Sequence, residues 1–337
     1  MLLGPSKGFR AKFAAWAPAA LLGARQPHGI RGLTYINVSH TDFDLPDHFS
    51  WVAKNALRSV YFIHDLIPIR YPELSRPRAV ARHTRRVRLA LCNADQIITG
   101  SQTVADDLAA YAAKEALPAA HITVSSIAGE GFSPVKQANE RPPYFICVGT
   151  IEPRKNHRFL FDVWDQLALL LGGATPRLVM VGQTGPMTGG ILSRLASHSH
   201  IELRGRCSDE ELADLMNDCT ALLMPSLAEG FGLPVTEALA LGTRVIASDT
   251  AVFHEISQGM AQLIDPSDAD AWANTIAQLA LEPHSSASDE QARTDRAARF
   301  FPPTWGAHFT AIDRAIAPPQ SRPALKSNAA CESSLAA

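Results

Sequence analysis

Short β-rich runs alternate with longer helical stretches along this 337-residue chain, and this rhythm constrains the fold more than any other feature. Strands that alternate with helices form parallel sheets, because each helix carries the chain back to the end of the sheet where the next strand begins. The sequence therefore predicts an α/β protein. Strands are expected at Tyr35–Val38, Val60–Ile63, Gln96–Thr99, Ile122–Ser125, Tyr144–Gly149, Leu178–Val181, Ile201–Leu203, Ala221–Met224 and Val245–Ala247. Helices are expected at Phe49–Leu57, Arg78–Cys92, Thr103–Ala113, His157–Leu171 and Asp209–Asp218.

A change of composition near the middle of the chain marks a domain boundary. Between Ser133 and Pro143 the residues are mostly Pro, Lys, Gln, Asn and Glu, which is typical of a linker. The length also suits two domains, because a single hydrophobic core stops growing at about 250–300 residues. We expect a Rossmann-like domain over residues 1–133, a linker over 134–143 and a second Rossmann-like domain over 144–300.

Both ends of the chain differ from a regular α/β repeat. No strand is evident before Tyr35, and Gly4 and Gly8 lie too early to form a glycine loop behind a strand, so the first domain is expected to be incomplete. The Pro, Ser and Ala content of residues 317–337 predicts a disordered tail.

The composition is that of an ordinary globular protein, with 46% hydrophobic and 19% charged residues. No apolar run approaches the roughly 20 residues of a membrane span. Residues Phe13–Ala24 imitate a secretory signal, but Pro18 interrupts them and no small-residue cleavage site follows. The five cysteines are scattered singly, which argues for a reducing compartment and against structural zinc. We therefore expect a cytoplasmic protein.

The charges are distributed unevenly. Residues 1–140 carry 16 Lys and Arg against 11 Asp and Glu, whereas residues 141–337 carry 15 against 22. Arg78, Arg82 and Arg85 share one face of a predicted helix. This face could bind anionic lipid headgroups or the phosphates of a lipid-linked acceptor, and a solvated surface is the alternative. Nucleic acid is disfavoured, because no aromatic residues are interleaved with the arginines.

Two glutamates flank a glycine-rich loop. Glu229 and Glu237 are separated by Gly230-Phe231-Gly232-Leu233-Pro234-Val235-Thr236. Glycines at 230 and 232 can adopt positive φ and admit a ligand close to the backbone, and Pro234 predicts the first turn of a helix. The free amides and dipole of a helix N-terminus suit an anion such as a diphosphate. The alternative is a turn glutamate followed by a solvated first-turn glutamate.

Basic residues follow the expected strand at Tyr144–Gly149. Gly149 and Thr150 lead into Arg154 and Lys155 just before the helix that begins at His157. A guanidinium can bind two phosphate oxygens at once, and an ammonium acts as a point charge. Cations at a helix start oppose its dipole, which favours a functional role over a solvated basic pair.

Two further motifs lie at strand ends. The run Tyr61-Phe62-Ile63-His64-Asp65-Leu66-Ile67-Pro68 places His64 and Asp65 at the mouth of the first sheet, where a structural His and a loop-capping Asp are the alternatives. Arg206 follows another strand and precedes a capping box that begins at Ser208. It could flank a nucleotide base or lie on the surface.

Three of these motifs together resemble a known family. The run from Glu229 to Glu237 matches the E-x7-E signature of retaining family 4 glycosyltransferases, and Gly149–Asn156 matches their G-T-x-E-P-R-K-N segment. His64–Glu73 resembles H-D-L-x-P-x-x-Y-P-E of bacterial mannosyltransferases. The resemblance covers residues 144–305 and, more loosely, extends back to Tyr35. It implies the GT-B fold, in which two Rossmann-like domains face each other across a cleft, and a helix within residues 301–316 that crosses back to the first domain.

The resemblance also assigns roles. Arg154, Lys155 and the amides of Gly232 and Leu233 would neutralise the diphosphate, while Glu229 would hold sugar hydroxyls and Glu237 the ribose. His64 would line the sugar pocket. The other donor-binding residues would be Asp65, Gly149, Thr150, Arg206 and Phe231. Many members have arginine where Thr150 stands.

The predicted activity is retaining transfer of a hexose, with mannose or a deoxy-mannose favoured, from a nucleoside diphosphate sugar. The acceptor would be a saccharide or polyprenol-linked glycan of polysaccharide or lipopolysaccharide biosynthesis, at the inner face of the cell membrane. We expect no cofactor and, without a D-x-D pair, no metal. Two alternatives stay open, a non-catalytic nucleotide-sugar-binding protein and a sugar-nucleotide epimerase. A dehydrogenase is disfavoured, because no G-x-G-x-x-G opens either domain.

Overall fold

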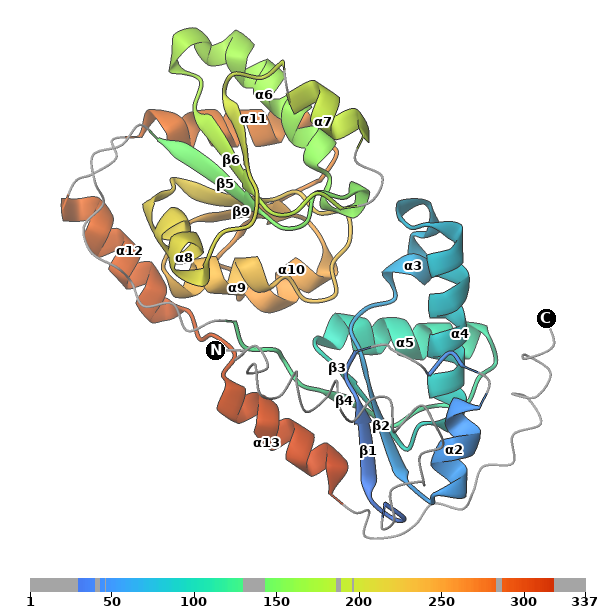
Figure 1. Cartoon of the computed structure of the whole chain (residues 1–337). Helices are drawn as coiled ribbons and strands as arrows, with labels where there is room; N and C mark the ends of the chain where they lie inside the picture. The colour runs from blue at the N-terminus through green and yellow to red at the C-terminus, as the bar shows by residue number, and fades with distance from the viewer. Residues whose placement is uncertain are drawn as a thin grey trace, which may run out of the picture.

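The computed structural model has two α/β domains, one above the other in Figure 1. It describes residues 30–39, 43–45, 47–129, 143–185, 189–195, 197–282 and 287–317. The signal-like stretch, most of the predicted linker and most of the predicted tail lie outside these residues. Within the described part of the chain, no helix combines the length and apolar character that crossing a membrane requires.

The amino-terminal domain is built on a four-stranded parallel sheet with the order β1-β2-β3-β4. Its strands are β1 (Thr34–Asn37), β2 (Arg58–Ile63), β3 (Gln96–Thr99) and β4 (Ile122–Val124). Its helices are α2 (His48–Lys54), α3 (Ile67–Arg70), α4 (Pro77–Asn93) and α5 (Gln102–Lys114). Alternate strand residues point to opposite faces. Tyr61 and Ile63 therefore pack with Val87 and Leu108 from α4 and α5, whereas Val60 and Phe62 face the other way.

The last helix of the chain covers the second face of this sheet. In α13 (Trp305–Ile316), Ala315 and the half-buried Ile312 pack against Val60 and Phe62. The guanidinium of Arg58 donates to the carbonyl of Ala315 over 2.6 Å. Figure 1 shows α13 returning from the carboxyl-terminal domain and lying beside this sheet.

The carboxyl-terminal domain contains a six-stranded parallel sheet with the order β10-β9-β8-β5-β6-β7. Its strands are β5 (Tyr144–Val148), β6 (Arg177–Val181), β7 (Ile201–Arg204), β8 (Ala221–Met224), β9 (Val245–Ser248) and β10 (Gln262–Ile264). Its helices are α6 (His157–Leu171), α7 (Gly189–Leu195), α8 (Asp209–Asp218), α9 (Leu233–Ala240), α10 (Ala251–Ser257), α11 (Ala269–Leu281) and α12 (Ala287–Arg299).

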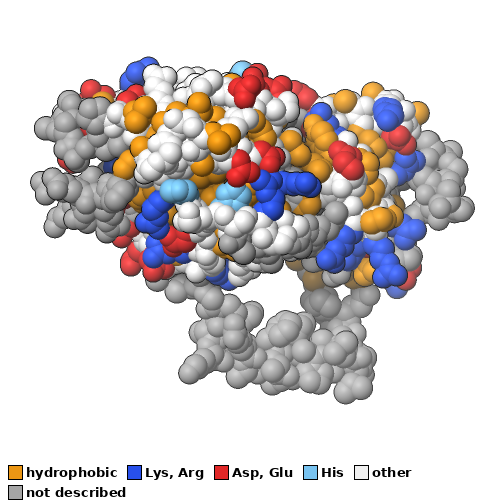
Figure 2. Space-filling view, turned by 90° about the horizontal axis from the view of Figure 1, so that it is seen from above, with side chains coloured by type: hydrophobic (Ala, Val, Ile, Leu, Met, Phe, Trp, Pro, Cys, Tyr) orange, Lys and Arg blue, Asp and Glu red, His pale blue; other side chains and the backbone are white. Residues whose placement is uncertain are grey.

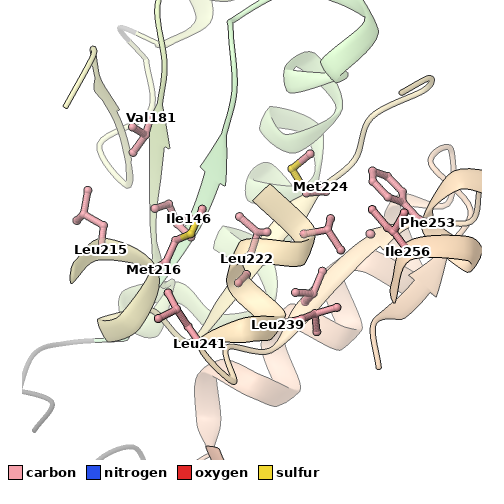
Figure 3. Packing of buried hydrophobic residues seen from close by; sticks show 14 of the residues in the cluster. Ile146, Val181, Leu215, Met216, Leu222, Met224, Leu239, Leu241, Phe253 and Ile256 are labelled. Carbon is pink, nitrogen blue, oxygen red and sulfur yellow. The ribbon is translucent and has the colours of Figure 1, made fainter. Parts of the chain in front are cut away.

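Both faces of this sheet are buried. Tyr144 and Ile146 pack on the side of α8, α9 and α10, while Phe145 and Cys147 pack on the side of α6 and α11. Figure 3 shows the first of these layers, in which Ile146 and Leu222 from the strands meet Leu239 and Phe253 from the helices. Because parallel strands are covered on two sides, they appear in the sequence as continuous apolar runs.

Candidate functional site

A charged cluster lies just beyond the carboxyl end of β5. After Gly149, a short 3-10 turn over Pro153–Lys155 carries Arg154 and Lys155, and Asn156 adopts a left-handed conformation with φ of 56° before α6 begins. A Cβ on Gly149 would lie 3.1 Å from Cε of Lys155. Glycine at 149, with φ of 148°, thus leaves room for the lysine side chain, which is 9% exposed.

Glu229 binds both cations of this cluster. It follows β8, and its carboxylate lies 2.7 Å from Nη1 of Arg154 and 2.5 Å from Nζ of Lys155. Burial raises the pKa of Glu229, but Lys155 and Arg154 more than offset this effect, so the pKa lies below its ordinary value. The backbone adds a bond from the amide of Leu227 to the carbonyl of Arg154, at 2.8 Å. The two loops therefore form one unit.

Arg154 retains hydrogen-bonding capacity within this cluster. Its Nε lies 2.6 Å from the carboxylate of Glu152, its Nη1 binds Glu229, and its side chain is 28% exposed. Among the described residues, none hydrogen-bonds its Nη2. Two cations and two carboxylates balance formally, and a phosphate oxygen could bind the remaining N–H groups of Arg154.

His64 and Asp65 follow β2 and lie next to Gly230 in the loop that carries Glu229. The imidazole of His64 is exposed, and its Nε2 donates to the carbonyl of Val38 over 2.8 Å. The carboxylate of Asp65 accepts from the amide of Ile67 at 2.9 Å and so caps the loop into α3. Burial lowers the pKa of Arg154, but Glu229, Glu152 and, to a smaller extent, Asp65 raise it above its ordinary value.

The segment Glu229–Glu237 contacts three strand ends of the amino-terminal domain. The hydroxyl of Ser101, after β3, donates to the carbonyl of Gly230 over 2.8 Å. A Cβ on Gly230 would lie 2.3 Å from the carbonyl oxygen of His64, after β2, and a Cβ on Gly129, after β4, would lie 2.6 Å from Cγ of Glu237. Residues at the carboxyl ends of the two sheets thus meet, which is where α/β proteins bind ligands.

The two loop glycines serve different purposes. Gly232 has φ of 99° and begins α9, as expected of a residue that must turn the chain into a helix. Gly230 has no positive φ, so that expectation was wrong. Its small size is required instead by the approach of His64. The first amides of α9 lack partners within the helix, which makes Gly232 and Leu233 available to an anion.

The other residues that were predicted to bind the donor are less closely connected to the cluster of Arg154, Lys155 and Glu229. Phe231 is buried against the core of the carboxyl-terminal domain. Thr150 and Arg206 are exposed, and in the described part of the chain Arg206 has no hydrogen bond or ion pair. A nucleotide-binding role for Arg206 and Thr150 stays a prediction. Within the same residues there is no group of three or more side chains suited to bind a metal, and metal independence stays a prediction too.

Sequence reasoning missed Glu152 and Glu255 as parts of this region. Glu152 lies inside the G-T-x-E-P-R-K-N segment, so a signal for it was present. Glu255, in α10, accepts hydrogen bonds from the start of α5 in the other domain. No local sequence pattern predicts a contact between residues about 150 positions apart.

Comparison with known proteins agrees with this geometry. Residues 142–282 match the sequence model of a family described as glycosyl transferases group 1. O-antigen chain mannosyltransferase RfbU of Salmonella typhimurium is 28% identical over 221 residues, which are 64% of this chain and 58% of that protein. Serotype-specific mannosyltransferase WbdA of Escherichia coli is 31% identical over 59% of this chain and 27% of its own length. The chain thus spans less than two thirds of either relative.

Solved structures show the same architecture. Sucrose-phosphate synthase of Thermosynechococcus elongatus superposes with a TM-score of 0.64 at 20% identity, covering 91% of this chain and 75% of its own. WaaG, a glycosyltransferase involved in lipopolysaccharide biosynthesis, also gives a TM-score of 0.64, at 14% identity over 93% of this chain and 84% of its own.

The two facing parallel sheets define an α/β protein of the GT-B fold, so the predicted fold class is confirmed. Over residues 142–282 the chain is similar to the group 1 glycosyl transferases, and proteins named as O-antigen mannosyltransferases are among its homologues.

Proposed function

We propose that the chain is a retaining hexosyltransferase that moves mannose or a deoxy-mannose from a nucleoside diphosphate sugar to a saccharide acceptor. The observation that carries this proposal is the cluster of Arg154, Lys155 and Glu229 at the sheet edge that faces the amino-terminal domain. The homologues named as mannosyltransferases support the choice of sugar.

The diphosphate would bind where the positive groups converge. The Nη2 of Arg154, which no described residue hydrogen-bonds, and the first amides of α9 would contact its oxygens. Lys155, fixed by Glu229, would supply a buried positive charge. These groups need no reorganisation as negative charge develops on the leaving diphosphate. Preorganised stabilisation of this kind typically contributes several kcal/mol.

Sugar recognition would fall to groups at the interface between the domains. Glu229 would accept from sugar hydroxyls in addition to its bonds with the two cations, because a carboxylate has about four acceptor positions. His64 would approach the sugar from the amino-terminal domain. Glu237, beside Gly129, would bind the ribose. In the front-face mechanism that the family resemblance implies, the departing diphosphate accepts the proton of the attacking hydroxyl.

The acceptor would approach from the amino-terminal domain. Figure 2 shows Lys and Arg side chains gathered over the end of the molecule that this domain forms. Arg78 and Arg85 of α4 are exposed there, whereas Arg82 is paired with Asp44 at 2.7 Å. A polyprenol-linked glycan on an anionic membrane would place phosphates next to this face.

A panel of GDP-, UDP- and dTDP-sugars tests the proposal, first by thermal shift and then by transfer of labelled sugar to glycan acceptors. A stabilising donor whose sugar appears in a larger glycan supports transfer with retention, which NMR of the anomeric proton verifies. Donor turnover that yields only free sugar, an epimer or free nucleotide would refute it in favour of epimerisation or hydrolysis. Binding without turnover would identify a non-catalytic protein.

A further inference from the structure

A single carboxylate joins the two domains at the start of α5. Glu255 belongs to α10 of the carboxyl-terminal domain, yet it accepts from the amides of Gln102 and Thr103 at 2.7 and 2.9 Å. The hydroxyl of Thr103 adds a third bond to the same carboxylate, at 2.7 Å. These amides lie in the first turn of α5, where no partner exists within the helix.

The same helix end also holds the glycine-rich loop. Ser101 is the N-cap of α5, and its hydroxyl accepts from the amide of Val104 at 3.2 Å while donating to the carbonyl of Gly230 at 2.8 Å. The start of α5 therefore contacts two separate elements of the carboxyl-terminal domain. One contact is made by α10 through Glu255, and the other is made by the loop that carries Glu229.

Electrostatics favours this arrangement. The N-terminus of a helix carries partial positive charge, and a carboxylate placed there is stabilised by the dipole and by charge-assisted hydrogen bonds. Glu255 is the acidic group that satisfies the two amides that Ser101 does not reach. Without it, two backbone donors at the domain interface would depend on water.

We propose that Glu255 is a positioning residue that holds the two domains together by capping α5 from the opposite domain. This inference rests on the proposed function. Glu255 does not contact the charged cluster. It acts through α5 and Ser101, which hold Gly230 against His64 and so place the end of β2 beside the loop that carries Glu229. Arg154, Lys155 and Glu229 all belong to the carboxyl-terminal domain, so nucleotide binding does not require the contact.

The variant Glu255→Ala tests this role. We expect kcat to fall about tenfold, equivalent to about 1.4 kcal/mol, while the Kd for the nucleoside diphosphate changes less than about twofold. Glu255→Gln keeps one acceptor oxygen and should recover part of the rate. Glu210→Ala, at an exposed position of α8, is the matched control and should behave as the parent protein.

Hydrogen exchange of the free protein supplies a readout that needs no turnover. The amides of Gln102 and Thr103 should lose protection in Glu255→Ala, and small-angle scattering should show a larger radius of gyration. Thr103→Val removes the hydroxyl bond and keeps the amide, so it should act in the same direction but weakly, and adding it to Glu255→Ala should cause no further loss.

The two proposals fail in distinguishable ways. If the parent protein turns over no donor, the proposed function fails, whereas exchange and scattering still test the interdomain contact. The positioning role would be overturned if, in Glu255→Ala, the amides of Gln102 and Thr103 exchanged as in the parent protein and the radius of gyration did not change. A kcat equal to that of the parent protein would overturn it as well. An equal loss in kcat and nucleotide affinity would also overturn it.

Discussion

The carbonyl oxygen of His64 lies 2.3 Å from the position that a Cβ on Gly230 would occupy. His64 follows the strand β2 of one domain, and Gly230 lies in the loop after Glu229 of the other. No side chain larger than a hydrogen atom fits between them, because real Cβ atoms do not approach oxygen so closely. The facing sheets thus depend on a glycine at this position for their close approach.

The variant Gly230→Ala should force the domains apart at this point. We expect the added methyl to cost about 1–3 kcal/mol, as overpacking typically does, and to reduce transfer more than nucleotide binding. Urea unfolding and scattering of the free protein measure the two effects. Gly190→Ala is the control, because a Cβ there would meet nothing within 4 Å. If Gly230→Ala has the same radius of gyration and the same transfer rate as the parent protein, then the contact between Gly230 and His64 does not require a glycine.

Neutralising Glu229 should lower the rate of sugar transfer without weakening nucleotide binding. In Glu229→Gln, Arg154 and Lys155 lose their shared negative partner, so affinity for a nucleoside diphosphate should stay the same or rise. Transfer should fall about a hundredfold, as when a preorganised group is removed from an active site. Steady-state kinetics and calorimetry report the two quantities. Equal losses in both would contradict the role given to Glu229.

Stability should decline on mild acidification because of His157. Burial, followed by the nearby Lys155, lowers the pKa of this residue to about 4. Since the unfolded chain binds the proton near pH 6.5 and the folded chain only near pH 4, stability falls as the pH drops between these values. The full effect is on the order of 3 kcal/mol.

The variant His157→Phe measures that contribution. Its free energy of unfolding should depend less on pH between 6.5 and 4 than that of the parent protein. Burial also lowers the pKa of His83, and this residue remains in both proteins, so the difference between them isolates His157. Glu229, with its lowered pKa, loses its contribution only as the pH falls below its ordinary range, near 4.5. Parallel pH profiles would refute the assignment.

Charge reversal on α4 tests binding to a membrane surface. Arg78 and Arg85 are exposed, and each contributes about 1 kcal/mol if it lies near an anionic bilayer. The double variant Arg78→Glu with Arg85→Glu should therefore sediment less with phosphatidylglycerol vesicles, and more so at low salt. Arg158→Glu, an exposed position on α6 of the other domain, is the control. Unchanged sedimentation of the double variant would eliminate this surface.

Much of the architecture could be predicted because strands buried on two faces leave continuous apolar runs. The bounds of β3, β8, α6 and α8 agree with the sequence predictions residue for residue. The strand β10 was not predicted, since it has three residues at the sheet edge and no full apolar run. The charged helix α12 was missed for a related reason, because its sequence has almost no apolar stripe.

The candidate site was predictable as a set of residues but not as a set of contacts. Local motifs identified Arg154, Lys155 and Glu229. Their pairing joins residues about 75 positions apart, so no local pattern encodes it. The size constraint on Gly230 likewise arises from His64 in the other domain. Sequence patterns indicate which groups lie at strand ends, whereas the choice of partner follows from how the two sheets meet.

Calorimetric titration of GDP, and of UDP in parallel, tests the central claim most directly. The account predicts that Arg154→Ala and Lys155→Ala each weaken binding of the preferred nucleotide by at least about tenfold, or about 1.4 kcal/mol. Arg158→Ala, exposed on the same domain, should bind as the parent protein does. Parental affinity in both cluster variants would contradict the claim that these cations hold the diphosphate.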